Sequence, residues 1–493
     1  MANTVPVPAH TFLHKARQVP AKTYLVGVLL LTASAWNWLQ GHEPHFAHEE
    51  AVYANKARSW LDDTPDAGWG LYRPIGLPAL GRLALAVHND VGSLRVIALL
   101  LSLFTLTAVY LVAAQWTSRR RAIVIVLVLL SGLGFLRRVP EFLNDIGSTG
   151  LLLIAVYLLV RTQEKQNSRA LYVLPVVVLA AFYLRYGIVG NMLAIAIAAV
   201  LAYGPRAWMA QGRRLAFAAA TLFLGLLPHF IYATKETGSP LGLIFWATDQ
   251  AERRFIGDGL LYYLAIFPYR LAGDLGAVVM VAGIVALAAA ARRLSKSGWR
   301  ASRLREETDQ RTVFLGTSAV LICVILGFAT DGEPRFIYLP VILLTILGVT
   351  AIANRVGRHW ASAVLAAVAM LAAVTTVATT QVIAHGAMPG PERLSDSTRP
   401  VAQQLSANTA CLIVSGYEPE MGWYSGCDAV TYREYRHMEP PANTDINFVL
   451  FERGRLQPDE KTLKKLLHGR KTDVRTIPTN GSAGDATVLT LRS

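Results

Sequence analysis

The sequence predicts a mainly α-helical polytopic membrane protein that carries a small α/β domain at its C-terminal end. Hydrophobic residues make up 53% of the 493 residues and charged residues only 16%, whereas soluble domains carry about a quarter charged residues. The apolar residues also gather in runs, and a helix that crosses a bilayer needs about 20 apolar residues. Towards the C-terminus these runs stop, and short strand-like segments alternate with helical patterns.

The apolar runs divide the first part of the chain into about eleven predicted spans. The third, fourth and fifth are short, so we expect them to tilt differently or to be partly broken. The first run has no small-x-small cleavage site after it, so we expect it to remain as a signal anchor. The predicted spans cover residues 23–40, 92–115, 121–136, 146–161, 171–185, 187–203, 214–233, 275–292, 312–330, 335–353 and 360–384.

Arginine-rich loops orient these spans. Basic clusters such as Arg119–Arg121, Arg213-Arg214 and Arg292–Arg311 occur in alternate loops, and an excess of Lys and Arg is typical of cytoplasmic loops. This predicts a multi-pass protein of the inner or plasma membrane, with a cytoplasmic N-terminus and an extracytoplasmic C-terminal part. The net charge of +14 is then a signal of topology, and nucleic-acid binding is not expected.

Two parts follow from this organisation. Residues 1–386 form the predicted transmembrane domain, with long outer loops at 41–90 and 234–274. Residues 387–493 form the predicted extracytoplasmic α/β domain, because strand-like runs and helical patterns alternate there.

The three cysteines lie in two environments. Cys411 and Cys427 belong to the predicted extracytoplasmic domain, and a disulfide between them is expected because that compartment is oxidising. Cys323 lies inside an apolar run, where an inert buried thiol is expected.

Acidic residues stand at two places on the predicted outer face. Glu49 and Glu50 begin a predicted helix in the first outer loop, on which Glu50, Tyr53 and Ala57 share one face. Asp145 precedes the fourth span. Acidic groups at helix starts are ordinary, because they complement the helix dipole or cap the first turn. Two acidic sites from separate loops at the same face nevertheless favour a functional site.

Arginines recur at the same outer level, against the positive-inside trend. Arg185 and Arg335 lie at predicted outer span ends, and Arg73 lies in the first outer loop. The planar guanidinium forms paired hydrogen bonds with phosphate, so a fixed phosphate would explain them. Interfacial arginines that reach towards water are the alternative.

Histidines in the first outer loop raise the question of a metal. His42, His45 and His48 stand at i, i+3 and i+6 beside acidic residues, so a divalent ion is conceivable there. Solvated loop histidines are the simpler interpretation, and no cofactor is certain.

These blocks together resemble the multi-spanning C-type glycosyltransferases, in the branch of protein O-mannosyltransferases and lipid A aminoarabinose transferases (family 39-like). The first outer loop of that family reads Asp-Glu-Ala-x-x-Tyr-Ala-x-x-Ala, and Glu49–Ala57 is similar, with Glu for the leading Asp and the Tyr one place closer. Tyr72–Gly76 and Arg335–Pro340 stand where the family has Tyr-x-Lys/Arg-Pro-Pro-Gly-like and Arg-Tyr-x-x-Pro blocks, and Asp145 resembles the acid of the second outer loop. The resemblance spans about residues 20–355.

The resemblance implies a polyprenyl-phosphate sugar as donor and a glycan, lipid or protein acceptor at the outer face of the membrane. A carboxylate would act as general base in an inverting displacement, and arginines would stabilise the departing phosphate. Glu49 or Glu50 is expected to be the base, with Asp145 positioning the acceptor or sharing the proton transfer. The implied site residues are the catalytic Glu49, Glu50 and Asp145, the phosphate-binding Arg73, Arg185 and Arg335, and the substrate-binding Tyr53 and Tyr72.

Other functions stay open at this point. A periplasmic polysaccharide polymerase also joins sugars from lipid carriers. A transporter or flippase of lipid-linked sugar would share the spans, although paired halves and charges inside the spans are not evident. The loop Ser415–Pro419 follows a predicted strand, where α/β folds place ligands, but it lacks a glycine-rich phosphate fingerprint. Neither the sugar nor the acceptor can be read from the residues.

Overall fold

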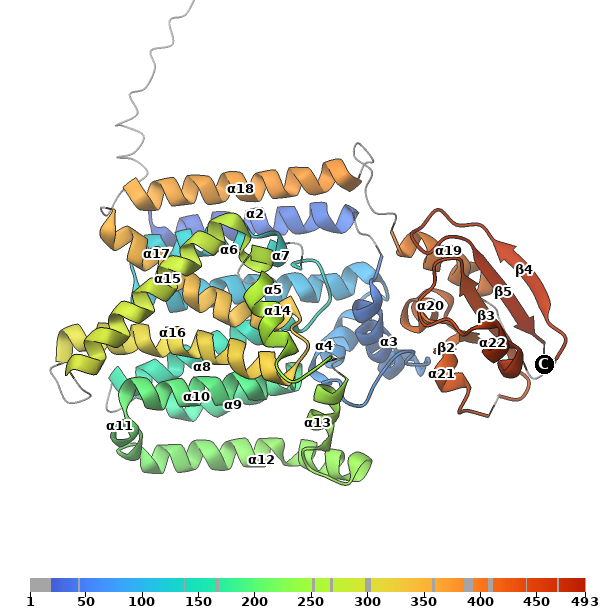
Figure 1. Cartoon of the computed structure of the whole chain (residues 1–493), viewed down its shortest axis with the longest axis horizontal. Coiled ribbons are helices and arrows are strands. Elements are labelled where there is room, and N and C mark those ends of the chain that lie inside the picture. The colour runs from blue at the N-terminus through green and yellow to red at the C-terminus, as the bar shows by residue number, and fades with distance from the viewer. Residues whose placement is uncertain are drawn as a thin grey trace, which may run out of the picture.

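The computed structural model of the chain is shown in Figure 1. Residues 1–18, which precede the first predicted span, lie outside the residues that the structure describes. The described residues are 19–42, 45–136, 138–164, 168–250, 253–266, 269–297, 303–356, 360–384, 393–406, 411–439, 441–467 and 470–492.

Helices occupy the predicted span positions and run along one common direction in Figure 1. Six helical segments in the described part of the chain are long and apolar enough to cross a membrane. The mainly helical membrane fold is thereby confirmed, while the number of eleven crossings stays a prediction. The helices at span positions are α2 (Ala21–His42), α5 (Val91–Trp116), α6 (Arg119–Leu130), α7 (Leu133–Leu136), α8 (Asp145–Glu164), α9 (Ala170–Leu184), α10 (Ile188–Tyr203), α12 (Gly212–Thr237), α15 (Tyr269–Ser297), α16 (Arg303–Ala329), α17 (Tyr338–Arg355) and α18 (Trp360–Ala384).

The three short predicted spans behave differently from one another. The third is divided into α6 and α7, which Ser131 and Gly132 separate. The fourth, α8, is continuous over 20 residues. The fifth, α9, contains Pro175 inside the helix, and a proline there removes one backbone hydrogen bond.

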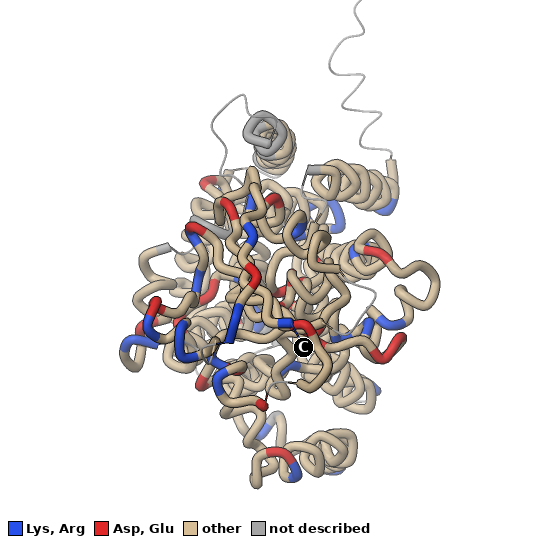
Figure 2. The backbone as a smooth tube through the Cα atoms, turned by 90° about the vertical axis from the view of Figure 1, so that its right-hand side faces the viewer, with Lys and Arg blue, Asp and Glu red and all other residues tan. Residues whose placement is uncertain are grey.

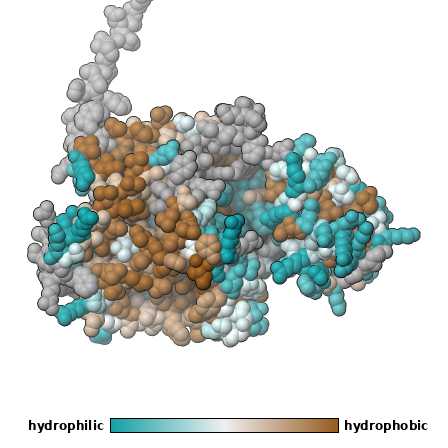
Figure 3. Space-filling model, viewed as in Figure 1, coloured by the Kyte–Doolittle hydropathy of each residue, from teal (hydrophilic) through white to brown (hydrophobic). Residues whose placement is uncertain are grey.

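The surface of the helical part is apolar, as a bilayer requires. Figure 3 shows a brown belt over these helices, with teal residues at one end and over the C-terminal domain. Large apolar side chains such as Leu30, Leu224 and Leu371 are more than half exposed in this belt. A soluble protein rarely leaves so large an apolar surface uncovered, so the belt fits contact with lipid.

Short helices cover the end of the bundle on which the C-terminal domain lies, and we call this the outer end, following the predicted orientation (Figure 1). The connections there contain α3, α4, α13, α14 and the 3-10 helix η1. Their bounds, with those of α11 at the opposite end, are α3 (His48–Asp62), α4 (Gly76–Leu85), α11 (Pro205–Met209), α13 (Gly242–Asp249), α14 (Asp258–Ile266) and η1 (Pro334–Ile337).

The C-terminal domain contains a five-stranded sheet in the order β2-β1-β3-β5-β4. Strand β1 is parallel to β2 and β3, whereas β5 is antiparallel to β3 and β4. Figure 2 looks onto this end of the molecule and shows basic and acidic residues interspersed. The elements are α19 (Ser395–Leu405), β1 (Cys411–Val414), α20 (Glu418–Ser425), β2 (Asp428–Val430), α21 (Tyr432–Tyr435), β3 (Asp445–Phe451), α22 (Glu460–Leu466), β4 (Asp473–Ile477) and β5 (Ala486–Leu491).

Both faces of this sheet are covered, which explains the strand pattern in the sequence. Ile413 and Val449 belong to one buried cluster, whereas the alternating residues Leu412 and Phe448 belong to another. Period-two alternation over two covered faces produces apolar runs, and the sequence predicts strands at four of them, 410–415, 429–432, 447–451 and 486–491. Strand β4 was not predicted, because four of its five residues are exposed at the edge of the sheet.

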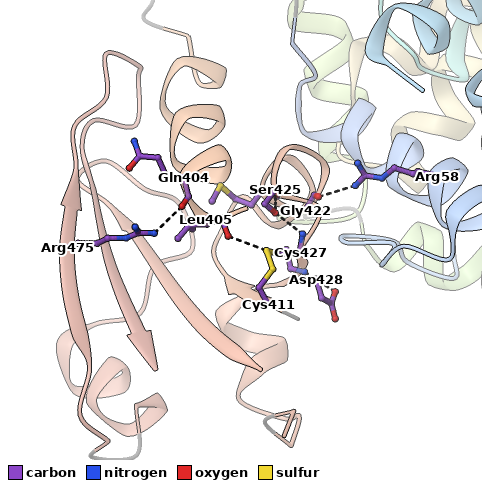
Figure 4. Close-up of a disulfide and its surroundings, with 11 residues drawn as sticks. Arg58, Gln404, Leu405, Cys411, Gly422, Ser425, Cys427, Asp428 and Arg475 are labelled. Carbon is purple, nitrogen blue, oxygen red and sulfur yellow. Dashed lines mark hydrogen bonds between the residues drawn. A yellow bond between two sulfur atoms is a disulfide. The ribbon is translucent and has the colours of Figure 1, made fainter. Parts of the chain in front are cut away.

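A disulfide joins Cys411 at the start of β1 to Cys427 just before β2 (Figure 4). We expect Cys411→Ala/Cys427→Ala to lower the free energy of unfolding of the domain by about 3 kcal/mol, because the bond closes a loop of 16 residues and so restricts the unfolded chain. Thermal unfolding of the purified chain, with and without reductant, measures this. Cys323→Ala, which removes a free thiol, is the matched control, and a reductant-insensitive wild type would contradict the expectation.

Candidate active site

The adjacent carboxylates of Glu49 and Glu50, in the first turn of α3, point in different directions. The helix starts after Ala47, whose extended backbone ends the preceding segment, and successive residues on a helix are about 100° apart. Glu50 therefore turns with Tyr53 and Ala57 into the protein, and all three are buried. Glu49 lies on a more open side, with its side chain 33% exposed.

Glu50 forms a buried ion pair that ties three elements together. Its Oε1 accepts hydrogen bonds from Arg95 Nε (3.2 Å) and from the Phe142 backbone N–H (2.9 Å), while Oε2 accepts from Arg95 Nη2 (3.0 Å). The Ala47 N–H also donates to Oε2. Both side chains of the pair are 2% exposed. Both carboxylate oxygens are thus occupied by donors from the protein.

Glu49 is held by two arginines from distant parts of the chain. Its Oε2 lies 2.6 Å from Arg73 Nη1, and its Oε1 lies 3.9 Å from Arg335 Nη2. Burial alone would raise the pKa of Glu49, but the charges of Arg73 and Arg335 outweigh it and lower the pKa to about 2. The carboxylate is therefore ionised over the whole physiological range.

Asp145 and Arg185 form a second ion pair in the same region. Asp145 is the first residue of α8, and Arg185 directly follows the end of α9. The Arg185 guanidinium stacks 4.5 Å from the ring centre of Phe336, which belongs to η1. Because η1 also carries Arg335, the two ion pairs meet at one place.

A small pocket at the outer end joins these groups. Its walls come from α5, from the connection between α7 and α8, and from the start of α17 with η1. Arg335 links the pocket to Glu49, and Asp145 links it to Arg185. The lining residues are Ala98, Leu101, Ser102, Arg138, Glu141, Leu143, Asp145, Ile146, Arg335 and Tyr338.

Sequence reasoning missed Arg138, which pairs with Glu141 in the pocket wall. The signal was available, because Arg138 lies on the predicted outer side and breaks the positive-inside trend as Arg73 does. Glu141 stands in the same block as Asp145, but only Asp145 was assigned a role.

The two predicted tyrosines lie beside Arg73. Its guanidinium is 5.7 Å from the ring centre of Tyr53 and 5.5 Å from that of Tyr72. The Tyr53 hydroxyl accepts a hydrogen bond from Asn144 Nδ2 (3.1 Å), and burial raises the pKa of Tyr53. The Tyr72 ring packs against Trp246 of α13.

Comparisons with known proteins bear on this arrangement. The family described as dolichyl-phosphate-mannose-protein mannosyltransferase matches residues 72–232. The crystal structure of ArnT from Cupriavidus metallidurans bound to undecaprenyl phosphate is similar at a TM-score of 0.66 and 14% identity, covering 94% of this chain and 97% of that one. Its apo state gives a TM-score of 0.67 at 14% identity, with 96% and 98% covered. None of the curated proteins compared with the sequence matches it.

The chain has the fold of ArnT. The resemblance stated from the sequence is therefore confirmed, and the match in fold extends through the C-terminal domain because nearly the whole chain is covered. In this fold, the predicted acidic and basic residues come from four separate connections at the outer end.

Two histidines of the first outer loop, His45 and His48, contact the C-terminal domain. His45 Nε2 lies 2.7 Å from Arg399 Nη1, and His48 Nδ1 lies 3.2 Å from Glu420 Oε2. The side chain of His42 is outside the described part. Among the residues that the structure describes, no group of three His, Cys, Asp or Glu side chains could hold a metal ion.

The loop Ser415–Pro419 contacts protein. It leads from β1 into α20, and the Gly416 carbonyl accepts a hydrogen bond from Arg455 Nε (2.6 Å). The Pro419 carbonyl accepts one from Asn55 Nδ2 of α3 (2.9 Å). This end of the sheet therefore docks onto the membrane part.

Proposed function

We propose that this protein transfers a monosaccharide from a polyprenyl-phosphate carrier to an acceptor at the outer face of the cytoplasmic membrane. The observation that carries the proposal is the convergence of Glu49, Arg73, Asp145, Arg185 and Arg335 at one end of an ArnT-like membrane fold. Such a site offers cations for a phosphate and a carboxylate for a proton. It lies where a lipid tail can remain among the apolar helices.

Arg73 and Arg335 are the residues proposed to bind the donor phosphate. Both contact Glu49, so their charges lie at one carboxylate. A phosphate placed between them would take over part of this pairing, because guanidinium groups bind phosphate through paired charge-assisted hydrogen bonds. That ArnT is found with undecaprenyl phosphate bound supports a carrier of this class.

The proposed chemistry is a single displacement. The acceptor hydroxyl oxygen attacks the anomeric carbon, the bond from that carbon to the phosphate oxygen breaks, and the configuration inverts. Glu49 accepts the hydroxyl proton, since both oxygens of Glu50 are already occupied by Arg95 and backbone donors. Arg73 and Arg335 stabilise the charge that develops on the departing phosphate. Asp145, held by Arg185, orients the acceptor.

We expect cells whose chain carries Arg73→Ala to accumulate a polyprenyl-phosphate monosaccharide. Hydrogen bonds to charged groups contribute about 1.5–3 kcal/mol, so losing this arginine should reduce donor turnover at least about tenfold. Mass spectrometry of extracted lipids measures the pool, and the mass of the accumulating species identifies the sugar. Arg82→Ala, which removes an exposed arginine from α4, is the control. Equal pools in both strains at equal membrane levels would overturn the proposal.

A further inference from the structure

We propose that the C-terminal domain positions residues of the transfer site. Helix α20 and Arg455 hold in place the two segments that carry Glu49 and Arg73, and we call this set of contacts the brace. The inference rests on the proposed function, and it assigns Glu420 and Arg455 as positioning residues. Neither residue is one of the proposed catalytic or phosphate-binding side chains. Both act through His48, the residue that directly precedes Glu49.

The first turn of α3 is held from outside by the C-terminal domain. His48 Nδ1 lies 3.2 Å from Glu420 Oε2 and 2.6 Å from Arg455 Nη2. Just before the helix, the Phe46 N–H donates to the Tyr424 hydroxyl (2.6 Å). The backbone around Glu49 is therefore fixed by groups that lie more than 370 residues away in the sequence.

The same helix is held further along. Asn55 Nδ2 donates both to the Ala67 carbonyl (3.1 Å) and to the Pro419 carbonyl (2.9 Å), and the side chain is fully buried. Arg58 donates to the Trp423 carbonyl (2.9 Å) and to the Gly422 carbonyl (3.0 Å), the latter contact visible in Figure 4. One side of α3 therefore contacts the C-terminal domain, through His48, Asn55 and Arg58. Another side contacts the membrane part, through Glu50 and Tyr53.

The loop that leads to Arg73 packs tightly against α20 at Ala67 and Gly68. A Cβ atom on Gly68 would come within 2.4 Å of Pro419, and one on Gly422 would come within 2.6 Å of the Ala67 side chain. Gly68 also has φ +76°, a backbone conformation that residues with a side chain rarely adopt. The loop and α20 therefore make a close contact that depends on Gly68 and Gly422. A shift of α20 would move the segment that ends in Tyr72 and Arg73.

Glu420 is poorly explained as a purely stabilising residue. It is 1% exposed, and its Oε1 has no hydrogen-bond partner among the described residues. A buried carboxylate with one unsatisfied oxygen reduces stability, and such groups in folded proteins call for another explanation. Holding His48, and with it the first turn of α3, supplies one.

The test compares variants of the full chain by kinetics and hydrogen exchange. We expect Glu420→Ala to lower kcat about tenfold with the donor KM changed less than about twofold, because a small displacement of a catalytic group slows the reaction. Glu420→Gln keeps the shape and one acceptor, so it should restore most of kcat. Amide exchange of residues 45–52 should be faster in Glu420→Ala and nearly normal in Glu420→Gln.

Two further variants make the result specific. Gly422→Ala pushes on Ala67 in the loop before Arg73, so it should raise the donor KM more than it lowers kcat. Arg492→Ala, which breaks an exposed pair with Asp473 in the same domain, should change neither. A Glu420→Ala enzyme with wild-type kcat and wild-type exchange would overturn the brace. A wild type that turns over no lipid-linked sugar, but shows the exchange change in Glu420→Ala, would overturn the proposed function and leave the brace standing.

Discussion

Glu49→Gln is expected to remove turnover almost completely while leaving the chain folded. General-base catalysis contributes about 10²- to 10⁴-fold, and glutamine has the same shape but cannot accept the proton. Release of free polyprenyl phosphate from a lipid-linked sugar by the purified chain in detergent measures this. No leaflets exist in detergent, so the assay also separates transfer from transport. Donor binding should persist, because Arg73 and Arg335 remain and lose only their carboxylate partner.

Asp62→Asn is the matched control for this variant, because it neutralises an acid at the other end of the same helix α3. It should retain wild-type turnover. If Glu49→Gln keeps more than about a tenth of the wild-type rate, another group takes the proton and the assignment is wrong, since the lower limit for general-base catalysis is about a hundredfold.

The pH dependence of the proposed transfer reaction follows from the same ion pairs. A base is active when it is deprotonated, so activity that depends on Glu49 falls only as the pH approaches its pKa from above. The charges of Arg73 and Arg335 lower that pKa to about 2. Once a phosphate draws these arginines, their effect on Glu49 weakens and its pKa rises. The acid limb of kcat should therefore lie at higher pH than the acid limb of kcat/KM.

Glu50→Gln is expected to act on stability instead. Replacing Glu50 removes the charge that Arg95 faces in a buried ion pair, and breaking such a pair costs about 3–5 kcal/mol. Arg95 would keep its contact with the His45 carbonyl but lose its buried carboxylate. Thermal unfolding in detergent measures the loss. The double variant Glu50→Leu/Arg95→Met should be more stable than Glu50→Gln, because no buried charge is left unpaired.

Comparing the two variants distinguishes the role of Glu49 from that of Glu50, although both are glutamates. Glu49→Gln should be folded and inactive, whereas Glu50→Gln should be destabilised. The opposite result, with a stable and inactive Glu50→Gln, would move the proton acceptor to Glu50 and contradict the proposed division of roles.

Local chemistry was sufficient to predict much of this protein. Apolar runs long enough for a bilayer located the helices from α2 to α18, because burial in lipid leaves a continuous pattern in the sequence. Arg73, Arg185 and Arg335 were found because charges at an apolar boundary are unexpected without a partner. The structure gives each of them a carboxylate partner, at Glu49 or at Asp145.

Other features depend on contacts between distant segments, which no local pattern records. Glu49 and Glu50 are equivalent by composition, and their difference arises from Arg95 and Phe142 on one side and Arg73 on the other. His45 and His48 are interpreted from the sequence as solvated loop histidines, with a metal site as the alternative, yet they contact the C-terminal domain, because α20 docks onto α3.

The sequence alone therefore determined which segments form the apolar helices and which charged groups lie at one end of the helical bundle. Hydrophobic burial and charge placement act over one or two helical turns, so a single segment carries the information. The partner of each charge was decided by folding, since ion pairs such as those of Glu49 join residues that are tens to hundreds of positions apart. The contact of the C-terminal domain with the first turn of α3 is of the same kind, because it depends on side-chain packing between segments that meet only in the folded chain.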